Sequence, residues 1–300
     1  MRILFIGGTR FVGKAIASEA IAREHEVTVF HRGNTTLPSA TSVIGDRDAD
    51  LSALASGSWD ATVDVCGYRP HQIDQIAESL GARAGRYVFI SSVSAYSPEI
   101  PPLSVESAAL ADTREVSADP AGIAMTGDTY GPLKVMCEQA TLRHYPDALI
   151  IRPTYVIGPD DYTMRFPAWV ERFVTQQEVE CPGPENAPMQ YVDVRDQATF
   201  IVDAIESGLS GAFHCAAPHT TFGQMVTAIR DVVAPTAAIS WLPAVDCEGR
   251  EAEFPLWGGG ESSPLMQMNP AAAIAAGLVL RPLAETVRDT AAWLDEQSQK

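Results

Sequence analysis

The segment Arg2-Ile-Leu-Phe-Ile-Gly-Gly-Thr-Arg-Phe-Val-Gly13 starts as an apolar stretch, breaks into a glycine-rich turn and resumes as an apolar helix. Residues 3–6 are apolar without alternation, which is typical of a strand buried inside a parallel sheet. Gly7 and Gly8 allow a tight turn and close approach to a ligand, and Gly13 allows the next helix to pack closely on the strand. Because a helix N-terminus presents unpaired N–H groups and the positive end of the helix dipole, this turn is either a diphosphate cradle or an ordinary β-to-α connection.

The composition limits the class of protein. The 300 residues are 46% hydrophobic, enough for a large core built as one α/β domain or as a main domain with a smaller lobe. The net charge of −17 disfavours nucleic acid or an anionic membrane as the main partner. Cysteines are widely spaced without a CxxC pair, which indicates neither a disulfide framework nor a metal site. With no cationic leader and no apolar run of about 18 residues, we expect a soluble, cytoplasmic protein.

The end of the second predicted strand bears on cofactor choice. Residues 26–30 form this strand, which ends at His31-Arg32-Gly33. In dinucleotide-binding folds an acidic residue here binds the adenosine ribose hydroxyls, whereas an arginine accommodates a 2′-phosphate. This chain has Arg32 at that point and Arg10 inside the glycine turn, and no Asp or Glu. The pattern favours NADP(H), with NAD(H) as the other option, although Arg32 alone is equally explained as a solvated loop charge.

Two further strands end in residues that belong at the same edge of the predicted sheet. Residues 42–44 run into Asp46 and Arg47, where Asp46 either contacts the adenine amine or caps the next helix. Residues 61–65 lead to Cys66. Ligands of open α/β sheets bind at the carboxyl ends of the strands, so these residues are candidates for the same site.

The fifth predicted strand, residues 86–90, delivers Ser91-Ser-Val-Ser-Ala-Tyr96 to that edge. The serines there are either site residues or plain hydrogen-bonding groups at a strand end. Residues 97–128 are rich in Pro, Ala, Ser and acidic residues and have no helical or alternating period. A loop of that length inside a compact domain is usually functional or mobile.

A helix is predicted to begin near Thr129 and to carry Tyr130-Gly-Pro-Leu-Lys134, because apolar residues recur at helical spacing from there. We expect Thr129 to cap the helix and Pro132 to occupy its first turn. Tyr130 and Lys134 are four residues apart and therefore share one face of the helix.

The remainder of the chain completes the sheet and adds a second region. Residues 148–151 and 211–215 are the sixth and seventh predicted strands. Residues 160–186 leave the pattern and contain an amphipathic helix at 166–175, and the C-terminal part is mainly helical and closes with residues 283–294. This order predicts a doubly wound parallel sheet of about seven strands with a smaller, mainly helical C-terminal lobe.

Tyr130, Lys134 and Ser92 form a chemically coherent set. A tyrosine phenol, with an ordinary pKa near 10, serves as an acid or base near neutral pH only when a positive charge favours the phenolate. Lys134 is placed to supply that charge, and Ser92 to hold a substrate oxygen while Tyr130 moves the proton. The alternative is that Tyr130 and Lys134 are an ordinary pair of neighbouring side chains on a helix surface.

Together, motifs spread over nearly the whole chain resemble the extended short-chain dehydrogenase/reductases of the NAD-dependent epimerase/dehydratase family. Their order and spacing make the resemblance specific. It implies a Rossmann-type NAD(P)-binding domain of residues 1–157 with about 189–217, and a substrate-binding lobe of about 158–188 with 218–300. The motifs are Gly7-Gly-Thr-Arg-Phe-Val-Gly13, Ser91-Ser-Val-Ser-Ala-Tyr96, Tyr130-Gly-Pro-Leu-Lys134, Arg152-Pro-Thr-Tyr-Val-Ile-Gly-Pro159 and Tyr191-Val-Asp-Val-Arg-Asp196.

The resemblance also implies roles for individual residues. Tyr130 is the expected catalytic acid/base, Lys134 its tuner and a ligand of the nicotinamide ribose, and Ser92 the hydroxyl that orients the substrate. Pro153 is the expected contact near the nicotinamide, and a homodimer through the helices at 70–80 and around Tyr130 is implied. The residues expected to bind the cofactor are Gly7, Gly8, Thr9, Arg10, Phe11, Val12, Gly13, His31, Arg32, Asp46, Arg47, Cys66, Ser91, Tyr130, Lys134 and Pro153.

Departures from the family pattern bear on the substrate. Relatives that process nucleotide sugars usually have Asn where this chain has Tyr155, and a diphosphate-binding Arg where it has Met189. The usual nucleotide clamp is therefore not expected. Arg10 stands where the middle glycine of the turn is usual, and the Gly-Gly-Thr-Arg-Phe spelling is similar to that of chloroplast stem-loop RNA-binding relatives.

These observations predict an NAD(P)-dependent oxidoreductase that transfers a hydride to or from a carbonyl or alcohol substrate, with Tyr130 as acid/base. One alternative is a nucleotide-sugar epimerase or dehydratase that recycles its cofactor in place. A second alternative, from a different class, is a nucleotide-sensing or RNA-binding protein that keeps the fold as a scaffold.

Overall fold

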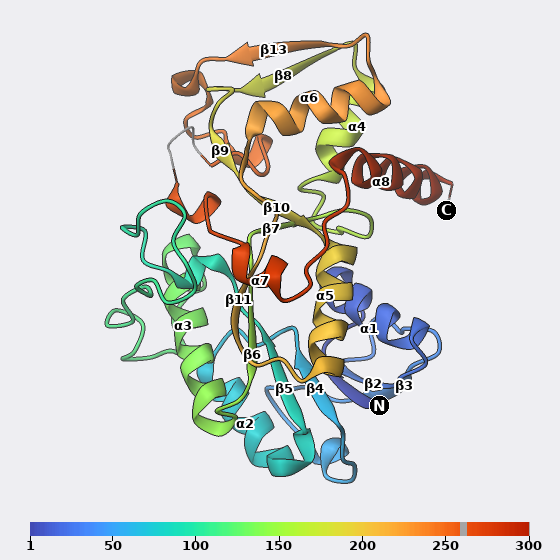
Figure 1. Ribbon diagram of the computed structural model, residues 1–300, viewed down its shortest axis with the longest axis vertical. Helices are drawn as coiled ribbons and strands as arrows, with labels where there is room; N and C mark the ends of the chain where they lie inside the picture. The colour runs from blue at the N-terminus through green and yellow to red at the C-terminus, as the bar shows by residue number, and fades with distance from the viewer. Residues whose placement is uncertain (259–262, 300) are drawn as a thin grey trace.

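The central sheet organises the computed structural model, which describes residues 1–258 and 263–299 (Figure 1). Within those residues, seven parallel strands lie in the order β11-β6-β5-β4-β1-β2-β3. The doubly wound sheet expected from the sequence is confirmed, and its order reverses at β1, where such folds bind ligands. The strands are β1 (Arg2–Ile6), β2 (Glu26–His31), β3 (Thr41–Ile44), β4 (Ala61–Asp64), β5 (Arg86–Ile90), β6 (Leu149–Pro153) and β11 (Gly211–Cys215).

Helices cover both faces of this sheet, which explains why β1 is apolar without alternation. α1 (Phe11–Ala22) and α5 (Val194–Ser207) pack together on one face, and α2 (Pro70–Leu80) and α3 (Gly127–His144) on the other (Figure 1). Ile3 and Phe5 join the apolar cluster that contains residues of α1 and α5. Leu4 and Ile6 join the cluster of α2 and α3. These four apolar side chains of β1 are thereby fully buried.

A second cluster of packed elements lies above the carboxyl edge of the sheet in Figure 1. It contains α4 (Pro167–Thr175), α6 (Phe222–Val233) and α8 (Leu283–Ser298). Trp169 is fully buried at its centre and meets the Phe222 ring edge-on, with 5.3 Å between the ring centroids. Aromatic burial of this kind supplies most of the stabilisation available to a small core.

This second region also contains strands that the sequence pattern did not reveal. β8 (Glu178–Pro182) pairs in parallel with β13 (Ala238–Leu242), and β9 (Pro188–Met189) pairs antiparallel with β12 (Thr220–Thr221). These strands are two to five residues long, which is too short for a periodic pattern to identify them. The division of the chain into a cofactor domain and a substrate lobe stays a prediction.

Two short elements join the regions. β7 (Tyr155–Ile157) pairs in parallel with β10 (Tyr191–Asp193) directly above the sheet. α7 (Ala271–Ala275) returns to the sheet, where Ala273 and Leu278 join the cluster of α1 and α5. Part of the C-terminal segment therefore packs with the predicted cofactor domain.

α3 begins earlier than its sequence pattern indicated. Its cap is Thr126, whose hydroxyl accepts from Thr129 N, while the Thr129 hydroxyl accepts from Thr126 N at 2.8 Å. The prediction that Thr129 caps the helix is wrong, because Thr129 is the third residue of the helix and forms a capping box with the N-cap residue Thr126. Pro132 accordingly lies inside the helix, beyond its first turn. Within residues 1–258 and 263–299, none of the helices has the length and apolar composition required to cross a bilayer.

Candidate active site

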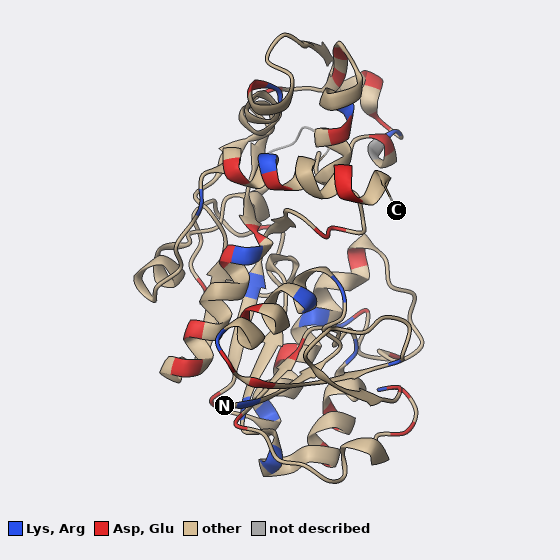
Figure 2. Cartoon of the chain, turned by 90° about the vertical axis from the view of Figure 1, so that its right-hand side faces the viewer, with Lys and Arg blue, Asp and Glu red and all other residues tan. Residues whose placement is uncertain are grey.

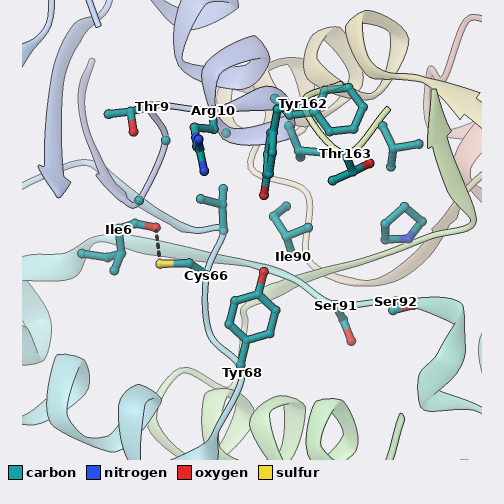
Figure 3. A pocket seen from close by; sticks show the side chains of 18 of the residues that line it. Ile6, Thr9, Arg10, Cys66, Tyr68, Ile90, Ser91, Ser92, Tyr162 and Thr163 are labelled. Carbon is teal, nitrogen blue, oxygen red and sulfur yellow. Dashed lines mark hydrogen bonds between the residues drawn. The ribbon is translucent and has the colours of Figure 1, made fainter. Parts of the chain in front are cut away.

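A cavity of about 840 Å³ opens at the carboxyl ends of β1, β2, β4, β5 and β6 (Figure 3). Every residue predicted from the sequence to bind the cofactor or to act in catalysis lines this cavity. The strand order brings them together, because the ends of parallel strands meet at one edge of the sheet. Their roles stay predictions.

The glycine turn is shaped to receive an anion. Gly7 and Gly8 have φ values of +83° and +109°, and a Cβ on Gly13 would lie 2.6 Å from the Gly8 Cα. Larger residues are therefore excluded at all three positions. α1 begins at Phe11 at the edge of the cavity with no side chain capping its N-terminus. The uncapped N–H groups at the cavity fit the diphosphate of a dinucleotide.

At the end of β2, His31 and Arg32 have different environments. The His31 ring accepts a hydrogen bond from Gly33 N at 3.1 Å and contacts the Ser42 hydroxyl at 3.0 Å. Burial also lowers the pKa of His31, so the ring supports the turn as a neutral group. Arg32 is exposed, and no carboxylate of the described residues lies within 4.0 Å of it. Its charge is therefore free for a ligand.

Arg10 reaches across the cavity. Its guanidinium carbon lies 4.3 Å from the centroid of the Tyr162 ring, and Figure 3 shows the two side chains side by side. Close by, Lys14 Nζ on α1 pairs with the Asp160 carboxylate at 2.7 Å. We call residues 158–165 the strap, because these two contacts hold that segment against the glycine turn.

Arg47 and Cys66 line the cavity, but their polar groups bond to protein atoms below the cavity floor. The Arg47 guanidinium makes two hydrogen bonds to the Asp64 carboxylate, at 2.8 and 2.9 Å, and Tyr87 donates its hydroxyl to the same group at 2.9 Å. Burial opposes ionisation of Asp64, but the charge and hydrogen bonds of Arg47 outweigh it and hold the pKa of Asp64 below its usual value. Burial raises the pKa of the Cys66 thiol, whose sulfur lies 3.3 Å from the Ile6 carbonyl oxygen (Figure 3).

Lys134 holds a fixed position beside Tyr130 on α3. Its ammonium group donates to the carbonyls of Gly67 at 2.9 Å and Ile90 at 2.8 Å, and its side chain is almost completely buried. The ammonium lies 5.8 Å from the centroid of the Tyr130 ring and 4.9 Å from that of Tyr68. A positive charge is thereby anchored by backbone groups next to the predicted acid/base.

The two serines after β5 have different environments. Ser91 donates its hydroxyl to the buried Glu138 carboxylate on α3. The Ser92 hydroxyl accepts from Ser94 N at 3.1 Å and donates to the Ser94 hydroxyl at 3.1 Å, a partner that a substrate oxygen could replace, and its side chain is only partly buried. Ser92 is therefore the serine whose hydroxyl remains available to a ligand in the cavity.

Gly131, between Tyr130 and Pro132, brings α3 into backbone contact with the segment after β5. A Cβ at this position would lie 2.1 Å from the Ser94 carbonyl oxygen. No side chain fits between the two elements, so Gly131 sets how closely the helix of Tyr130 approaches the segment of Ser92.

A buried polar network lies behind these serines, and the sequence did not reveal it. Arg152 on β6 donates to both oxygens of Glu138, at 2.9 and 2.6 Å, and to the Tyr96 hydroxyl. The Tyr96 hydroxyl also lies 2.6 Å from His214 Nε2 on β11. Burial lowers the pKa of His214. Each buried polar group is satisfied by another, so the network fixes α3, β5, β6 and β11 relative to one another.

Several cavity residues were also missed by sequence reasoning. Figure 3 shows Tyr68 and Tyr162 pointing toward each other from opposite sides of the cavity. They belong to loops whose position depends on tertiary contacts, so no local motif marks them. Further residues of this kind include Asn34, Thr35, Tyr68, Thr154, Tyr155, Tyr162, Thr163, Arg165 and Met266.

Comparison with known proteins finds a family match in the central part of the chain and relatives with the same fold. The model of the NAD dependent epimerase/dehydratase family matches residues 72–215. A curated relative, the chloroplast stem-loop binding protein of 41 kDa b from Arabidopsis thaliana, is 23% identical over 225 residues, covering 68% of this chain and 55% of its own. The chain thus spans about half the length of that relative.

Solved structures share the fold over the whole chain. A putative epimerase from Burkholderia cenocepacia superposes with a TM-score of 0.75 at 19% identity, covering 97% of both chains. The Bordetella bronchiseptica enzyme WbmH, in complex with NAD+, gives 0.73 at 18% identity and 98% of both chains. The Thermus thermophilus UDP-glucose 4-epimerase complexed with NAD gives 0.71 at 16% identity, covering 98% of this chain and 99% of the other.

Proposed function

We propose that this chain is an extended short-chain dehydrogenase/reductase of the NAD-dependent epimerase/dehydratase family and acts as an NAD(P)-dependent oxidoreductase, which the family match over residues 72–215 and the shared fold support. It transfers a hydride to or from a carbonyl or alcohol substrate. The observation that carries the proposal is that Ser92, Tyr130 and Lys134 line one cavity with an uncapped glycine turn.

The nicotinamide, when bound, supplies or accepts the hydride. In the reducing direction Tyr130 donates its hydroxyl proton to the substrate oxygen as the C=O group becomes an alcohol, and in the oxidising direction it takes that proton back. Ser92 orients the substrate oxygen by a hydrogen bond. Lys134 stabilises the phenolate left on Tyr130 and is placed to bind the ribose, while Pro153 lines the nicotinamide end of the cavity.

The substrate is expected to enter from the second region. We assign residues of about 158–188 and 218–300 to a substrate-binding lobe, since the strap and Met266 line the cavity opposite the sheet. Tyr155 and Arg165 belong to this side. A cytoplasmic homodimer through α2 and α3 remains the expectation from the family resemblance.

We further propose that the protein prefers NADP(H). The support is Arg32, which is exposed at the cavity without a carboxylate partner among the described residues, and the lack of an acidic residue at the end of β2. Arg10 is the weaker candidate for the 2′-phosphate, because its guanidinium already lies on Tyr162.

Cofactor titration tests this preference. We expect NADPH to bind at least about tenfold more tightly than NADH, and Arg32→Gln to weaken NADPH binding about tenfold by removing a charge-assisted contact. NADH binding by the same variant should stay within about twofold. Arg288→Gln, on an exposed part of α8, is the matched control and should change neither affinity. Equal affinity for the two cofactors, or preference for NADH, would contradict the assignment of Arg32.

One observation favours the nucleotide-sugar epimerase alternative. The strap is tied to the glycine turn by Lys14–Asp160 and Arg10–Tyr162, which favours a retained cofactor that is recycled in place. Against it, Met189 is buried where such relatives have a diphosphate-binding arginine. An epimerase would purify with bound nicotinamide, turn over without added cofactor and be stabilised by UDP-glucose. A purified protein without nicotinamide absorbance and without a UDP-glucose response excludes it.

Stem-loop binding is a property in the name of the relative and is not favoured here. Figure 2 shows Asp and Glu residues spread over the visible face from one end of the molecule to the other. With a net charge of −17, the chain lacks the basic surface that nucleic acid requires.

A further inference from the structure

Unpaired arginines gather at the cavity of this acidic protein. The chain has 38 acidic residues against 21 Lys and Arg. Elsewhere most buried or half-buried arginines either pair with carboxylates, as Arg23, Arg152 and Arg195 do, or donate to backbone carbonyls, as Arg69, Arg83 and Arg172 do. In the described part of the chain, Arg10, Arg32 and Arg165 line the cavity with no carboxylate within 4.0 Å. Where carboxylates are so abundant, charges left unpaired at one cavity indicate anionic ligands.

The positions of these arginines divide them between two ligands. Arg10 and Arg32 lie at the glycine turn and at the end of β2, where the phosphates and the adenosine of a dinucleotide bind in this fold. Arg165 lies elsewhere, with its guanidinium carbon 5.9 Å from the centroid of the Tyr155 ring. Tyr155 follows Pro153 at the end of β6, on the side where the nicotinamide and substrate are expected. A dinucleotide bound at Arg10 and Arg32 would therefore not contact Arg165, which remains available to the substrate.

The Arg165 side chain is already oriented. Its Nε donates to the Thr163 hydroxyl at 3.1 Å, and the Tyr155 ring lies beside the guanidinium. Its two Nη groups have no hydrogen-bond partner among residues 1–258 and 263–299. An arginine held at Nε presents these groups as a planar fork that matches a carboxylate or a phosphate.

We propose that Arg165 binds a carboxylate or phosphate group of the substrate, and that the substrate is a small anionic carbonyl compound or the corresponding alcohol. This inference rests on the proposed hydride transfer and adds the substrate class. A cavity of about 840 Å³ is in the range of a single ligand site, so a bound dinucleotide leaves space for a small substrate only. Met189, buried in β9, offers no charge to the diphosphate of a larger, nucleotide-linked substrate.

The experiment compares carbonyl probes that carry an anionic group with neutral counterparts that lack it. The protein is saturated with NADP+ or NADPH, and thermal unfolding is followed with 2-oxobutyrate against 2-butanone and with dihydroxyacetone phosphate against dihydroxyacetone, each at millimolar concentration. The first pair tests a carboxylate and the second a phosphate. Reduction of each carbonyl by NADPH is measured in parallel. The proteins compared are wild type, Arg165→Gln, Arg165→Lys and the exposed control Arg288→Gln.

We expect at least one anionic probe to raise the Tm of the cofactor-bound wild type while its neutral partner does not. Arg165→Gln should lose that response and about 30-fold of kcat/KM for the anionic probe, as expected for a charge-assisted pair. Arg165→Lys should recover part of both, and Arg288→Gln should match wild type.

Three outcomes overturn the inference: no anionic probe stabilises the cofactor-bound protein, neutral probes act equally well, or Arg165→Gln responds like wild type. Stabilisation by UDP-glucose that is independent of Arg165 would also overturn it, in favour of a nucleotide-linked substrate. Failure of NADP+ and NADPH themselves to bind contradicts the proposed function instead, so the two failures are distinguishable.

Discussion

Tyr130→Phe is expected to lower kcat by about 1,000-fold, within the range lost when a positioned general acid or base is removed. The substitution deletes only the hydroxyl that exchanges a proton with the substrate oxygen. The ring stays beside Lys134, whose ammonium is held by the carbonyls of Gly67 and Ile90 rather than by the phenol. Cofactor affinity and thermal stability should therefore stay close to those of wild type, and steady-state kinetics with a parallel cofactor titration measure both.

Tyr145→Phe is the matched control for this variant. Tyr145 follows the last turn of the same helix outside the cavity, and its hydroxyl makes only a long contact of 3.4 Å with the Gly81 carbonyl. We expect its kinetics to equal those of wild type. Turnover by Tyr130→Phe within a few-fold of wild type would remove Tyr130 from the mechanism and leave the fold without its proposed chemistry.

Arg47→Met is expected to destabilise the fold by about 3–5 kcal/mol, the usual cost of removing one partner of a buried ion pair. Asp64 is completely buried, and without Arg47 its charge keeps only the Tyr87 hydroxyl and the Cys66 N–H as partners. Urea unfolding at neutral pH measures the loss. Arg32→Met, a change of the same kind at an exposed site, should cost less than about 0.5 kcal/mol.

A second substitution separates the ion pair from simple packing. Arg47→Met combined with Asp64→Leu removes both charges, and we expect it to recover much of the stability, because an apolar pair of similar size avoids burying an unpaired charge. If the double variant were no more stable than Arg47→Met, the loss would come from the shape of Arg47 and the ion pair would not be its cause.

The dependence on pH has opposite signs in the two proteins. In wild type the pKa of Asp64 is lowered in the folded state, so its contribution is present above the unfolded pKa and is lost as the pH falls through the folded value. In Arg47→Met, burial without a counter-charge raises that pKa, so the folded state takes up a proton and the variant gains stability as the pH falls below neutral. Urea unfolding between about pH 7 and pH 5 should show the variant gaining stability while the Asp64 contribution in wild type stays constant, and the wild-type loss should begin only below about pH 4.

A structural feature could be predicted from the sequence when the residues that encode it lie close together in the chain. The glycine turn and the Tyr130 and Lys134 pair were found because each is encoded within a few residues, and the parallel sheet then brings the strand ends together. The cap of α3 was misplaced by three positions because Thr126 and Thr129 form a reciprocal pair, and proline is more usual in a first turn than at the position of Pro132.

Contacts between distant segments left no such signal. Arg47 was predicted from the sequence as a cofactor contact, and nothing local showed that β4 brings Asp64 beneath it to form a buried ion pair. The contact of Arg10 with Tyr162 and the isolation of Arg165 depend on how the strap returns over the cavity. Among the described residues, β8 and β13 pair only with each other although they lie far apart in the chain, and each is five residues long, so no local signal predicted the pair.

The contact between Gly131 and the Ser94 carbonyl has a consequence for how the protein tolerates change. Side chains differ in size and change rotamer, whereas the backbone peptide group has the same dimensions at every position. Since two peptide groups in contact set the gap between α3 and the segment after β5, the closest approach of Ser92 and Tyr130 is fixed by backbone rather than by a side chain. Substitutions at exposed positions of α3 should therefore leave the spacing of the reacting groups unchanged.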